Sequence, residues 1–572
     1  MKKYIFGTLL LSTALLSGCS LDETPKSAFS EEEAFKSSTL IYANSVANVY
    51  SSIENYIYGQ DAGSIHTLQQ YSSDESMIPG RQGDWVDGGK WQNFFLHNFD
   101  SSVDMYRNIW NQIYTIIGQS NKGIDKLNGL QNNEDAATYV YELRALRAIF
   151  YYYLMDLWGQ VPLVTSSKIN TNDVVQSNRA DVFKFVVSEL EACLPHLAND
   201  MSQNEGKYYG RITKPVVYMC LVKCAMNSPL YTINPTSATS YQAFVGNDMS
   251  GNNTVSETLG ANVTELGKKV SITVDGKARN AWETVKYCVE KLEALGYTLQ
   301  PNYADNFTIS NQNSKENIFT RPNDDKTYRY YDYNLMRSLH YNHAGAIGYS
   351  GWNGACATVF AMNVYGYGKA DVDPRLKLNY YTDKDYVEDT GKPVEDGATG
   401  QDLEYLPLKP QIDFPAGADP HVVKCAGARM KKYQLDLTSS TNGITNNDLV
   451  VWRYADALLL KAEAEYRLGN TGAALAAINT VRARVGAPAL TSLTLNVISN
   501  ERLKELAWEG VRRMDAIRYG IFTQPTKDRY EGVWHNAVAG NYLNDTQGYT
   551  TIFPIPYDVM SLNKNLKQNP GY

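Results

Sequence analysis

Residues 144–163 read RALRAIFYYYLMDLWGQVPL and carry the pattern of an amphipathic helix that ends abruptly. Apolar side chains recur at the 3.6-residue spacing of one helix face, at Leu143, Leu146, Phe150, Leu154 and Leu157. Gly159 is a typical helix-ending residue, and Pro162 prevents the helix from resuming. Because one face of this helix is apolar, it must pack against a partner.

Similar helical patterns recur along the chain. A stripe of Trp110, Ile113, Tyr114 and Ile117 precedes the first helix and predicts a helix hairpin with it. A second pair is predicted at about 182–197 and 214–231. A third is predicted at about 450–468 and 473–484, split by Gly469 and Gly472, and one more long helix at about 497–519.

Paired helices in series favour tetratricopeptide-like units, in which each pair buries its face against its neighbours. We therefore predict a mainly α fold: a tetratricopeptide-like helical superhelix with a loop-rich irregular half carrying short strands. The helix hairpins should occupy about 104–231 and 450–520. The polar stretches 232–280 and 371–447 read as loops, with a weak strand signal at 270–274. Long loops in compact proteins are often functional, although simple insertion is an equal alternative.

The N-terminus has the features of a lipoprotein signal. Lys2 and Lys3 precede an apolar run of 13 residues at 4–16, too short to span a bilayer, and Leu-Ser-Gly-Cys follows at 16–19. We predict that residues 1–18 are a signal peptide, that Cys19 carries the lipid that holds the chain on a membrane, and that residues 19–30 form the anchor and tether. The alternative is an ordinary signal peptide with an incidental cysteine.

Composition narrows the class of protein. The formal net charge of −8 argues against nucleic-acid partners and against docking on anionic lipid. Seven cysteines in 572 residues are too few for a disulfide framework. The 42 tyrosines suit a wet recognition surface, although most are expected to be half-buried on helices.

Enzyme motifs are missing from the sequence. It contains no His-Glu-x-x-His, no Gly-x-Ser-x-Gly and no Walker loop. His340 and His343 lie three apart without an obvious third ligand. Cys220 and Cys224 are interpreted as buried thiols rather than metal ligands. We expect no catalytic residues, no cofactor and no metal.

Several motifs together resemble the RagB/SusD family of outer-membrane lipoproteins. Residues 144–163 are similar to its RALRAFYYF…LYGDVPL signature. Further matches lie at 452–456, 462–464, 478–484, 501–515, 553–556 and 568–572. The resemblance runs from the lipobox to the last residue and is weakest at 232–280 and 371–447. It implies that residues 31–572 form one domain of this family.

The resemblance also implies a role. A family member would lie on the cell exterior as a lid over a SusC-like TonB-dependent transporter and deliver captured oligo- or polysaccharide to it. The alternative is a RagB-like peptide-binding lipoprotein on the same scaffold. Trp faces with Asp, Arg and Asn favour sugar, whereas a groove with strand edges and apolar pockets would favour peptide.

The first candidate ligand loop lies within the segment at about 60–100. Trp85 and Trp91 offer ring faces for sugar stacking, beside glycines and carboxylates. Asp74 and Arg81 match an Asp…Arg pair that the resemblance places in contact with ligand. The competing interpretation is that this loop packs on the helices and that both charges bridge internally.

A second candidate lies within the segment at about 232–447. Trp352 and Asn353 belong to a Trp-Asn-Gly sequence that resembles the aromatic platform of glycan-binding members. A buried Trp that closes a turn is the alternative. Among five nearby tyrosines, Tyr331 and Tyr341 are further candidates for the same surface.

The charged family motifs are interpreted as scaffold. Arg144, Arg147 and the charges of residues 501–515 should pair between neighbouring helices, and Glu463 and Arg482 should do likewise.

Overall fold

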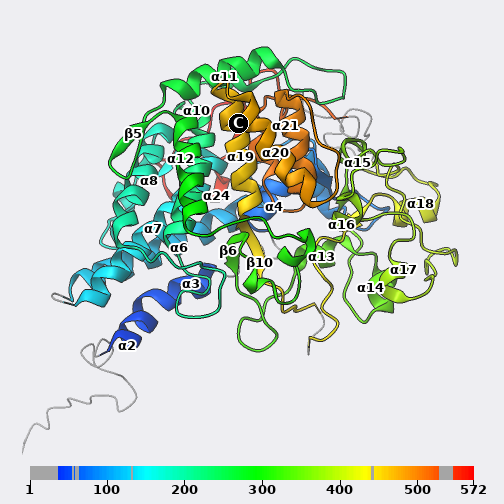
Figure 1. Ribbon diagram of the computed structural model, residues 1–572, viewed down its shortest axis with the longest axis horizontal. Helices are drawn as coiled ribbons and strands as arrows, with labels where there is room; N and C mark the ends of the chain where they lie inside the picture. The colour runs from blue at the N-terminus through cyan, green and yellow to red at the C-terminus, as the bar shows by residue number, and fades with distance from the viewer. Residues whose placement is uncertain (1–36, 54–56, 58–62, 131–132, 440–442, 527–544) are drawn as a thin grey trace, which may run out of the picture.

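The computed structural model describes residues 37–53, 57, 63–130, 133–439, 443–526 and 545–572. The predicted signal peptide, Cys19 and the tether lie outside these residues. The described chain has a helical half and a loop-rich half, visible at left and right in Figure 1. This arrangement confirms the mainly α fold with short strands predicted from the sequence. No helix within the described ranges is long and apolar enough to cross a membrane.

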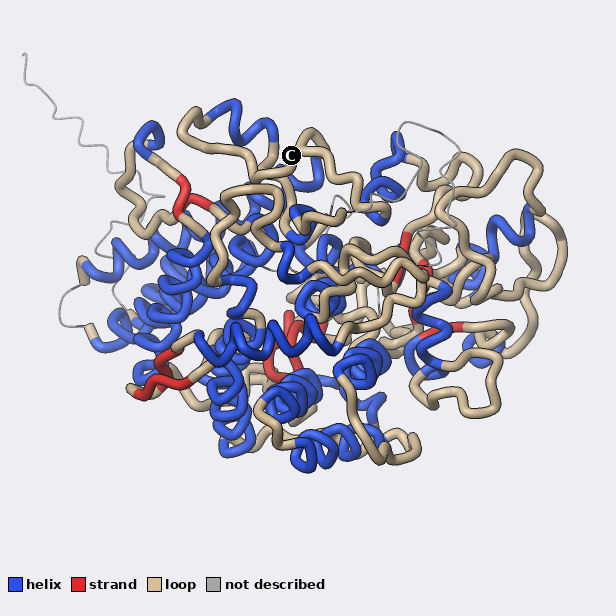
Figure 2. The backbone as a smooth tube through the Cα atoms, turned by 90° about the horizontal axis from the view of Figure 1, so that it is seen from above, coloured by secondary structure: helices blue, strands red, loops and turns tan. Residues whose placement is uncertain are grey.

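The helical half is built from helices that pack in series (Figure 2). Two of the predicted hairpins are present: α6 (Asp104–Asn128) with α7 (Glu134–Trp158), and α19 (Tyr454–Arg467) with α20 (Thr471–Arg484). The second begins at Tyr454 rather than near 450, because the residues before it form a strand. The larger helices are α6 (Asp104–Asn128), α7 (Glu134–Trp158), α8 (Arg179–Cys193), α9 (Lys214–Met226), α11 (Glu257–Lys269), α12 (Ala281–Ala294), α19 (Tyr454–Arg467), α20 (Thr471–Arg484), α21 (Leu495–Glu505) and α22 (Arg512–Arg518). Smaller ones are α2 (Ser38–Tyr42), α3 (Asn48–Ile53), α10 (Ser228–Tyr231) and α24 (Tyr557–Leu562).

Local capping sets the ends of α7 as the sequence indicates. The side chain of Asn133 accepts a hydrogen bond from the Ala136 amide at 2.9 Å, which satisfies a free N–H of the first turn. Gly159 follows with φ 72°, a conformation that suits glycine. The chain then passes into a two-stranded ribbon of β2 (Val161–Pro162) and β3 (Gln176–Ser177).

Two predictions about residues 182–280 were wrong. The expected pairing of 182–197 with 214–231 is not the main contact, because α8 packs chiefly on α7 and α9 packs chiefly on α12. The stretch 232–280 contains α11, whose apolar face is thin because two of its four buried residues are glycines. The hairpin β4 (Ile272–Val274) with β5 (Lys277–Arg279) then accounts for the strand signal.

The predicted helix at about 497–519 is two helices, α21 and α22. Trp508 and Gly510 lie between them, both with φ 65°. The buried Trp508 indole donates to the carbonyl of Asn379 at 3.1 Å, so a tertiary contact holds the break in the helix. Nothing in the local apolar spacing reveals such a contact.

The loop-rich half consists of short elements joined by long connections. Its helices are α4 (Ile65–Gln70), α5 (Lys90–Phe95), α13 (Tyr333–Ser338), α14 (Tyr341–Ala346), α15 (Val359–Tyr365), α16 (Leu376–Asn379), α17 (Val387–Thr390) and α18 (Pro420–Cys425). Its antiparallel strand pairs are β1 (Ser76–Met77) with β7 (Cys356–Ala357), and β8 (Tyr380–Tyr381) with β9 (Arg429–Met430). A longer pair, β6 (Asn317–Arg321) with β10 (Leu449–Arg453), leads directly into α19.

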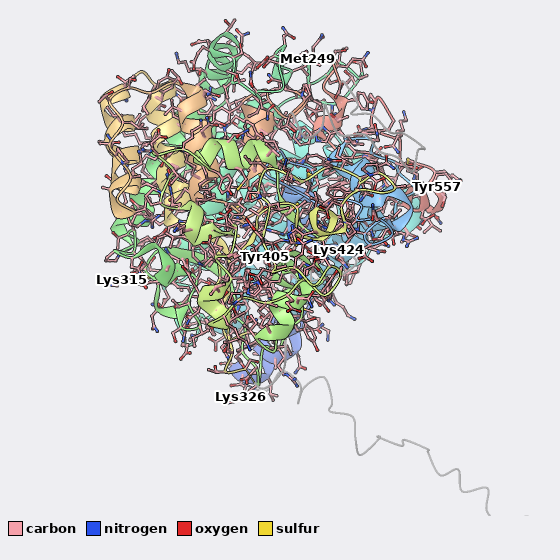
Figure 3. All side chains as sticks on the ribbon, turned by 90° about the vertical axis from the view of Figure 1, so that its right-hand side faces the viewer. Met249, Lys315, Lys326, Tyr405, Lys424 and Tyr557 are labelled. Carbon is pink, nitrogen blue, oxygen red and sulfur yellow. The ribbon has the colours of Figure 1, made fainter. Side chains whose placement is uncertain are left out.

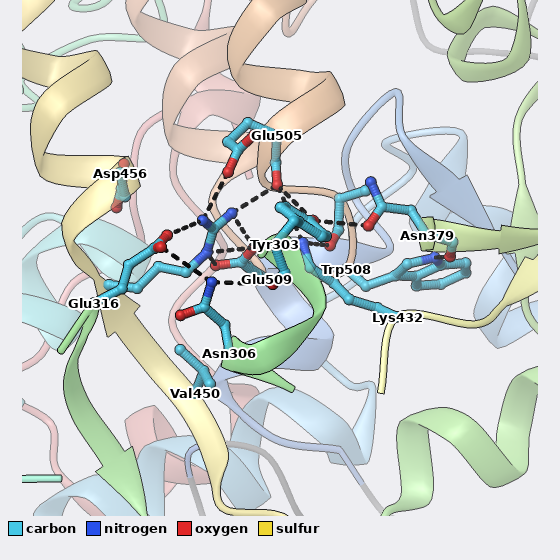
Figure 4. Close-up of polar contacts among 12 residues, drawn as sticks. Tyr303, Asn306, Glu316, Asn379, Lys432, Val450, Asp456, Glu505, Trp508 and Glu509 are labelled. Atoms are coloured by element: carbon cyan, nitrogen blue, oxygen red, sulfur yellow. Dashed lines mark hydrogen bonds and ion pairs between the residues drawn. The ribbon is translucent and has the colours of Figure 1, made fainter. Parts of the chain in front are cut away.

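A buried charge network joins the two halves (Figure 4). The guanidinium of Arg453, at the end of β10, bonds Glu316 at 2.7 Å, Glu505 at 2.8 Å and Glu509 at 2.8 Å. Lys432, which follows β9, pairs with Glu509. The nearby guanidinium groups, with Arg484 first, hold the pKa of Glu505 well below its usual range despite burial. Breaking one such buried pair leaves an uncompensated charge, so the network favours a fixed junction.

The predicted scaffold pairs are also present. Arg144 and Arg147 on α7 both bond Glu189 of α8, at 2.6 and 2.8 Å. Arg482 bonds Glu501 at 2.6 Å, and Glu463 bonds Arg518 at 2.7 Å. These contacts confirm that the family motifs hold neighbouring helices together.

Candidate ligand-binding surface

Four aromatic rings from two distant parts of the chain form a continuous row, which we call the aromatic arc: Trp85, Trp352, Tyr333 and Tyr331. Ring centroids lie 6.4 Å apart for Trp85 and Trp352, and 5.7 Å apart for Trp352 and Tyr333. Tyr333 and Tyr331 are also 5.7 Å apart. Tyr331 is 37% exposed and the other three are partly exposed, so the arc can offer ring area to a ligand.

Local backbone geometry places Trp85 at one end of the arc. Trp85 has φ 60°, and its indole N–H donates to the main-chain carbonyl of Trp352 at 2.8 Å. A Cβ atom at Gly354 would lie 2.4 Å from the Trp85 ring, so only glycine allows this approach. The Trp352 amide in turn donates to the carbonyl of Met336 in α13 at 2.7 Å. The Trp-Asn-Gly segment therefore holds the Trp85 ring in place.

A charged pair lies beside the arc. The ammonium of Lys424 lies 2.5 Å from a carboxylate oxygen of Asp84 and 5.9 Å from the ring of Tyr341. Figure 3 faces the loop-rich half and shows Lys424 near the middle of this side. Burial raises the pKa of the half-buried Tyr341 hydroxyl, which keeps that hydroxyl protonated as a donor.

The expectation that Asp74 contacts ligand is corrected by its burial. Asp74 is 1% exposed, and both carboxylate oxygens bond the guanidinium of Arg512, at 2.6 and 2.9 Å. The amide of Asn253 donates to the same carboxylate. Asp74 thus anchors its loop to α22. This agrees with the competing interpretation, in which its charge is paired inside the protein.

The expectation that Arg81 contacts ligand is also corrected. Its side chain has no exposed surface and donates to three main-chain carbonyls, at 2.6 Å to Val423, 3.2 Å to Gly354 and 3.0 Å to Ala426. Burial lowers the pKa of this guanidinium to about 9. Arg81 therefore ties the segments of Trp85, Trp352 and Lys424 together beneath the surface rather than reaching a ligand.

Trp91 and Asn353 also support the surface from below. Trp91 is 3% exposed, packs edge-on against Trp85 at 6.2 Å and donates its indole N–H to Asp87 at 2.9 Å. Asn353 is 2% exposed, donates to the carbonyl of Lys424 at 3.0 Å and accepts from Arg429 at 2.8 Å. Their expected ligand contacts are corrected because neither side chain reaches the surface.

The structure brings Trp85, Trp352 and Tyr331 into the aromatic arc, and it places Tyr341 beside Lys424. Their role in ligand binding stays a prediction. Sequence reasoning did not select Tyr333, Asp84 or Lys424. Tyr333 belongs to the tyrosine group already noted. The sequence around Lys424 does not indicate its position, because that position depends on Asp84, 340 residues away.

Two family models match the chain. One, described as the SusD family, matches residues 315–572. The other, described as starch-binding and associating with the outer membrane, matches residues 21–225. The chain belongs to the SusD/RagB family. Members of this family are binding proteins rather than enzymes, which agrees with the sequence prediction.

Individual relatives are distant but span most of the chain. The Starch-binding protein SusD of Bacteroides thetaiotaomicron is 23% identical over 80% of this chain and 76% of its own length. The SusD-like protein P25 of Formosa agariphila is 22% identical over 96% of each chain. These SusD/RagB relatives match the chain across both halves of the fold.

Solved structures share the fold. A laminarin binding SusD-like protein is 22% identical, with a TM-score of 0.62 over 93% of this chain and 99% of that one. Surface glycan-binding protein A from Bacteroides thetaiotaomicron, in complex with laminarihexaose, is 18% identical, with a TM-score of 0.62 over 92% and 98%. At these identities the likeness establishes the SusD/RagB fold.

Proposed function

We propose that this protein is a cell-surface lipoprotein that binds oligo- or polysaccharide on the aromatic arc and passes it to a SusC-like TonB-dependent transporter. Family membership supports the binding role. The glycan ligand is supported by relatives whose names state starch, laminarin and laminarihexaose binding.

The aromatic arc is the observation that carries the proposal. Sugar rings stack their C–H faces on Trp and Tyr, while hydroxyl groups need polar partners at the rim. The arc presents four rings in a row, which suits several sugar units of one chain. The charges of Lys424 and Asp84 at the rim of the arc pair with each other, which favours a neutral glycan over an acidic one.

A peptide ligand is the second candidate on this scaffold. Peptides that add a strand need an accessible sheet edge with pockets for alternate side chains. The strands β1 and β7, which connect the two arc-bearing segments, contain only two residues each. Such short edges offer few main-chain hydrogen bonds, so the arc favours sugar.

The direct test screens one protein preparation against both ligand classes. A glycan array and a peptide library are probed with residues 20–572, and any hit is measured by affinity electrophoresis or calorimetric titration. We expect binding to a neutral glycan. Binding to peptides alone would favour the second candidate.

The proposed location and partner rest on the N-terminal lipobox and on the family. An anchored protein without import chemistry must hand its ligand on. We expect co-purification with a β-barrel transporter from the native membrane in mild detergent. Recovery solely as a free monomer would contradict the delivery step.

A further inference from the structure

Three potential metal ligands converge beside the aromatic arc. They are a carboxylate of Asp396, the Nδ1 atom of His421 and the thiol of Cys425, and these ligand atoms all lie within 4.8 Å of one another. Asp396 and Cys425 are buried, whereas the His421 side chain is 13% exposed. Cys425 directly follows Lys424, so the group lies beneath the rim of the surface described above.

Two separate elements build this group. His421 and Cys425 are four residues apart on α18, which places both on one helix face, and Asp419 caps that helix by accepting from the His421 amide at 2.9 Å. Asp396 comes from a turn between bridged residues Glu395 and Asp402. Its carboxylate accepts from the Ala398 amide at 3.1 Å, which orients it.

Two of the three separations between ligand atoms match those of a tetrahedral zinc ion, and the third is at most 4.8 Å. The Asp396 Oδ2 to His421 Nδ1 distance is 3.4 Å, and the His421 Nδ1 to Cys425 Sγ distance is 3.7 Å. Zinc bonds of ~2.0–2.3 Å at tetrahedral angles separate neighbouring O and N ligands by roughly 3.4 Å, and N and S ligands by roughly 3.6 Å. A good N–H···O hydrogen bond would be about 2.7–3.2 Å, shorter than the observed O to N distance.

A buried histidine faces the carboxylate from the other side. His340 has no exposed side-chain surface, and its Nε2 has no hydrogen-bond partner among the described residues. Its Nδ1 accepts from the Asn342 amide at 3.2 Å, which leaves the proton on Nε2, 4.0 Å from Asp396 Oδ1. At 4.0 Å this N–H does not hydrogen-bond the carboxylate, so His340 is a buried polar neighbour of the group rather than part of it.

We propose that Asp396, His421 and Cys425 bind one zinc ion, beside the buried side chain of His340. Thiolate, imidazole and carboxylate together suit zinc rather than calcium or magnesium, which prefer oxygen alone. On binding, the Cys425 thiol forms a bond to zinc through sulfur and releases its proton to solvent. A water molecule would complete a tetrahedral site.

The ion would have a structural consequence for the ligand surface. It would join α18, which carries Lys424, to the turn at Asp396. This inference stands on the ligand geometry and does not require that the ligand be a glycan.

The test uses the full chain after removal of metal with a chelator. Zinc is titrated against a competing chromophoric chelator, and cobalt is used as a spectroscopic substitute. We expect one zinc per chain and a thiolate-to-cobalt charge-transfer absorption. Cys425→Ser should abolish that absorption, and both Cys425→Ser and His421→Gln should weaken zinc binding at least tenfold.

Cys193→Ser is the matched control, because it removes a buried thiol in α8 and leaves the ligand set intact. It should bind zinc as the parent does. If Cys425→Ser does not fold, His421→Gln decides, since that side chain is partly exposed. An absence of zinc binding by the parent, or parental affinity in His421→Gln, would overturn the proposal.

Discussion

The indole N–H of Trp85 donates a 2.8 Å hydrogen bond to the main-chain carbonyl of Trp352, across 267 residues of sequence. This bond joins the two segments that carry the aromatic arc. Arg81 repeats the connection underneath by donating to Gly354, two residues further on. The aromatic arc is therefore held by side-chain bonds to main-chain carbonyls. These bonds do not use the outward faces of the rings.

Removal of an arc ring should weaken glycan binding while the fold survives. Stacking a sugar on Trp352 buries apolar area worth roughly 1–2 kcal/mol, so Trp352→Ala should bind about 5–30-fold more weakly. Tyr331→Ala should act in the same direction. Calorimetric titration with the best glycan from the array measures both.

Tyr557→Ala is the control for these variants. Tyr557 is 60% exposed on α24 and lies well away from Lys424 in Figure 3. It should bind like the parent. Parental affinity in both arc variants would place the ligand elsewhere.

Arg81→Ala should act on stability. It leaves the buried carbonyls of Val423 and Gly354 without this donor, while the carbonyl of Ala426 keeps a bond from Arg429 at 2.7 Å. The loss should be roughly 2–4 kcal/mol in the free energy of unfolding. Chemical denaturation measures it, with Gln82→Ala as the exposed neighbouring control. A large loss of glycan affinity with unchanged stability would instead mean that Arg81 reaches the ligand.

Gly354→Ala should disturb the arc without removing any ring. The new Cβ would lie 2.4 Å from the Trp85 indole, so that ring must move and binding should fall several-fold. Gly345→Ala, in α14, meets no heavy atom within 4 Å and provides the control. Tryptophan fluorescence and glycan affinity should both change in Gly354→Ala. Both should keep their parental values in Gly345→Ala.

Glu75 should make stability depend on pH. It is fully buried, and burial raises the pKa of its carboxyl from 4.5 to about 7. The folded state therefore retains a proton that the unfolded state loses first. Stability from this group is present below about pH 4.5, falls as pH rises to about 7, and then stays constant, a change of roughly 3 kcal/mol at most.

Glu75→Gln should remove this dependence. Urea unfolding of parent and variant at pH 5 and pH 8 gives the difference between the two conditions. Between pH 5 and pH 8, the variant should lose less stability than the parent does. An equal difference in both proteins would show that Glu75 does not titrate in this range.

Cys19→Ala should move the protein from the membrane fraction to the soluble fraction. Stable residence needs more than one acyl chain, and all chains of a lipoprotein modification attach at this residue. Immunoblots of fractionated cells measure the change, and circular dichroism should show an unchanged fold. Retention of the variant in membranes would argue against lipid at Cys19.

The sequence by itself determined the hairpins of α6 with α7 and of α19 with α20, because a helix needs only local spacing and an ending residue. Leu143 to Leu157 and Gly159 define α7 without help from other segments. The charge pairs of Arg144 and Arg482 were also predictable in kind, since buried charges need partners. Trp85, Trp352 and Tyr331 could be selected from their residue types, whereas Tyr333 was not selected.

Only the tertiary structure decided which polar residues face solvent. Asp74 and Arg81 have the residue types of a sugar site, yet contacts with Arg512 and with distant carbonyls bury them. Lys424 and the ligand group of Asp396, His421 and Cys425 depend on loops that meet from distant positions. Irregular backbone has no repeating spacing of apolar residues. Burial of its side chains therefore follows from long-range contacts rather than from a local sequence pattern.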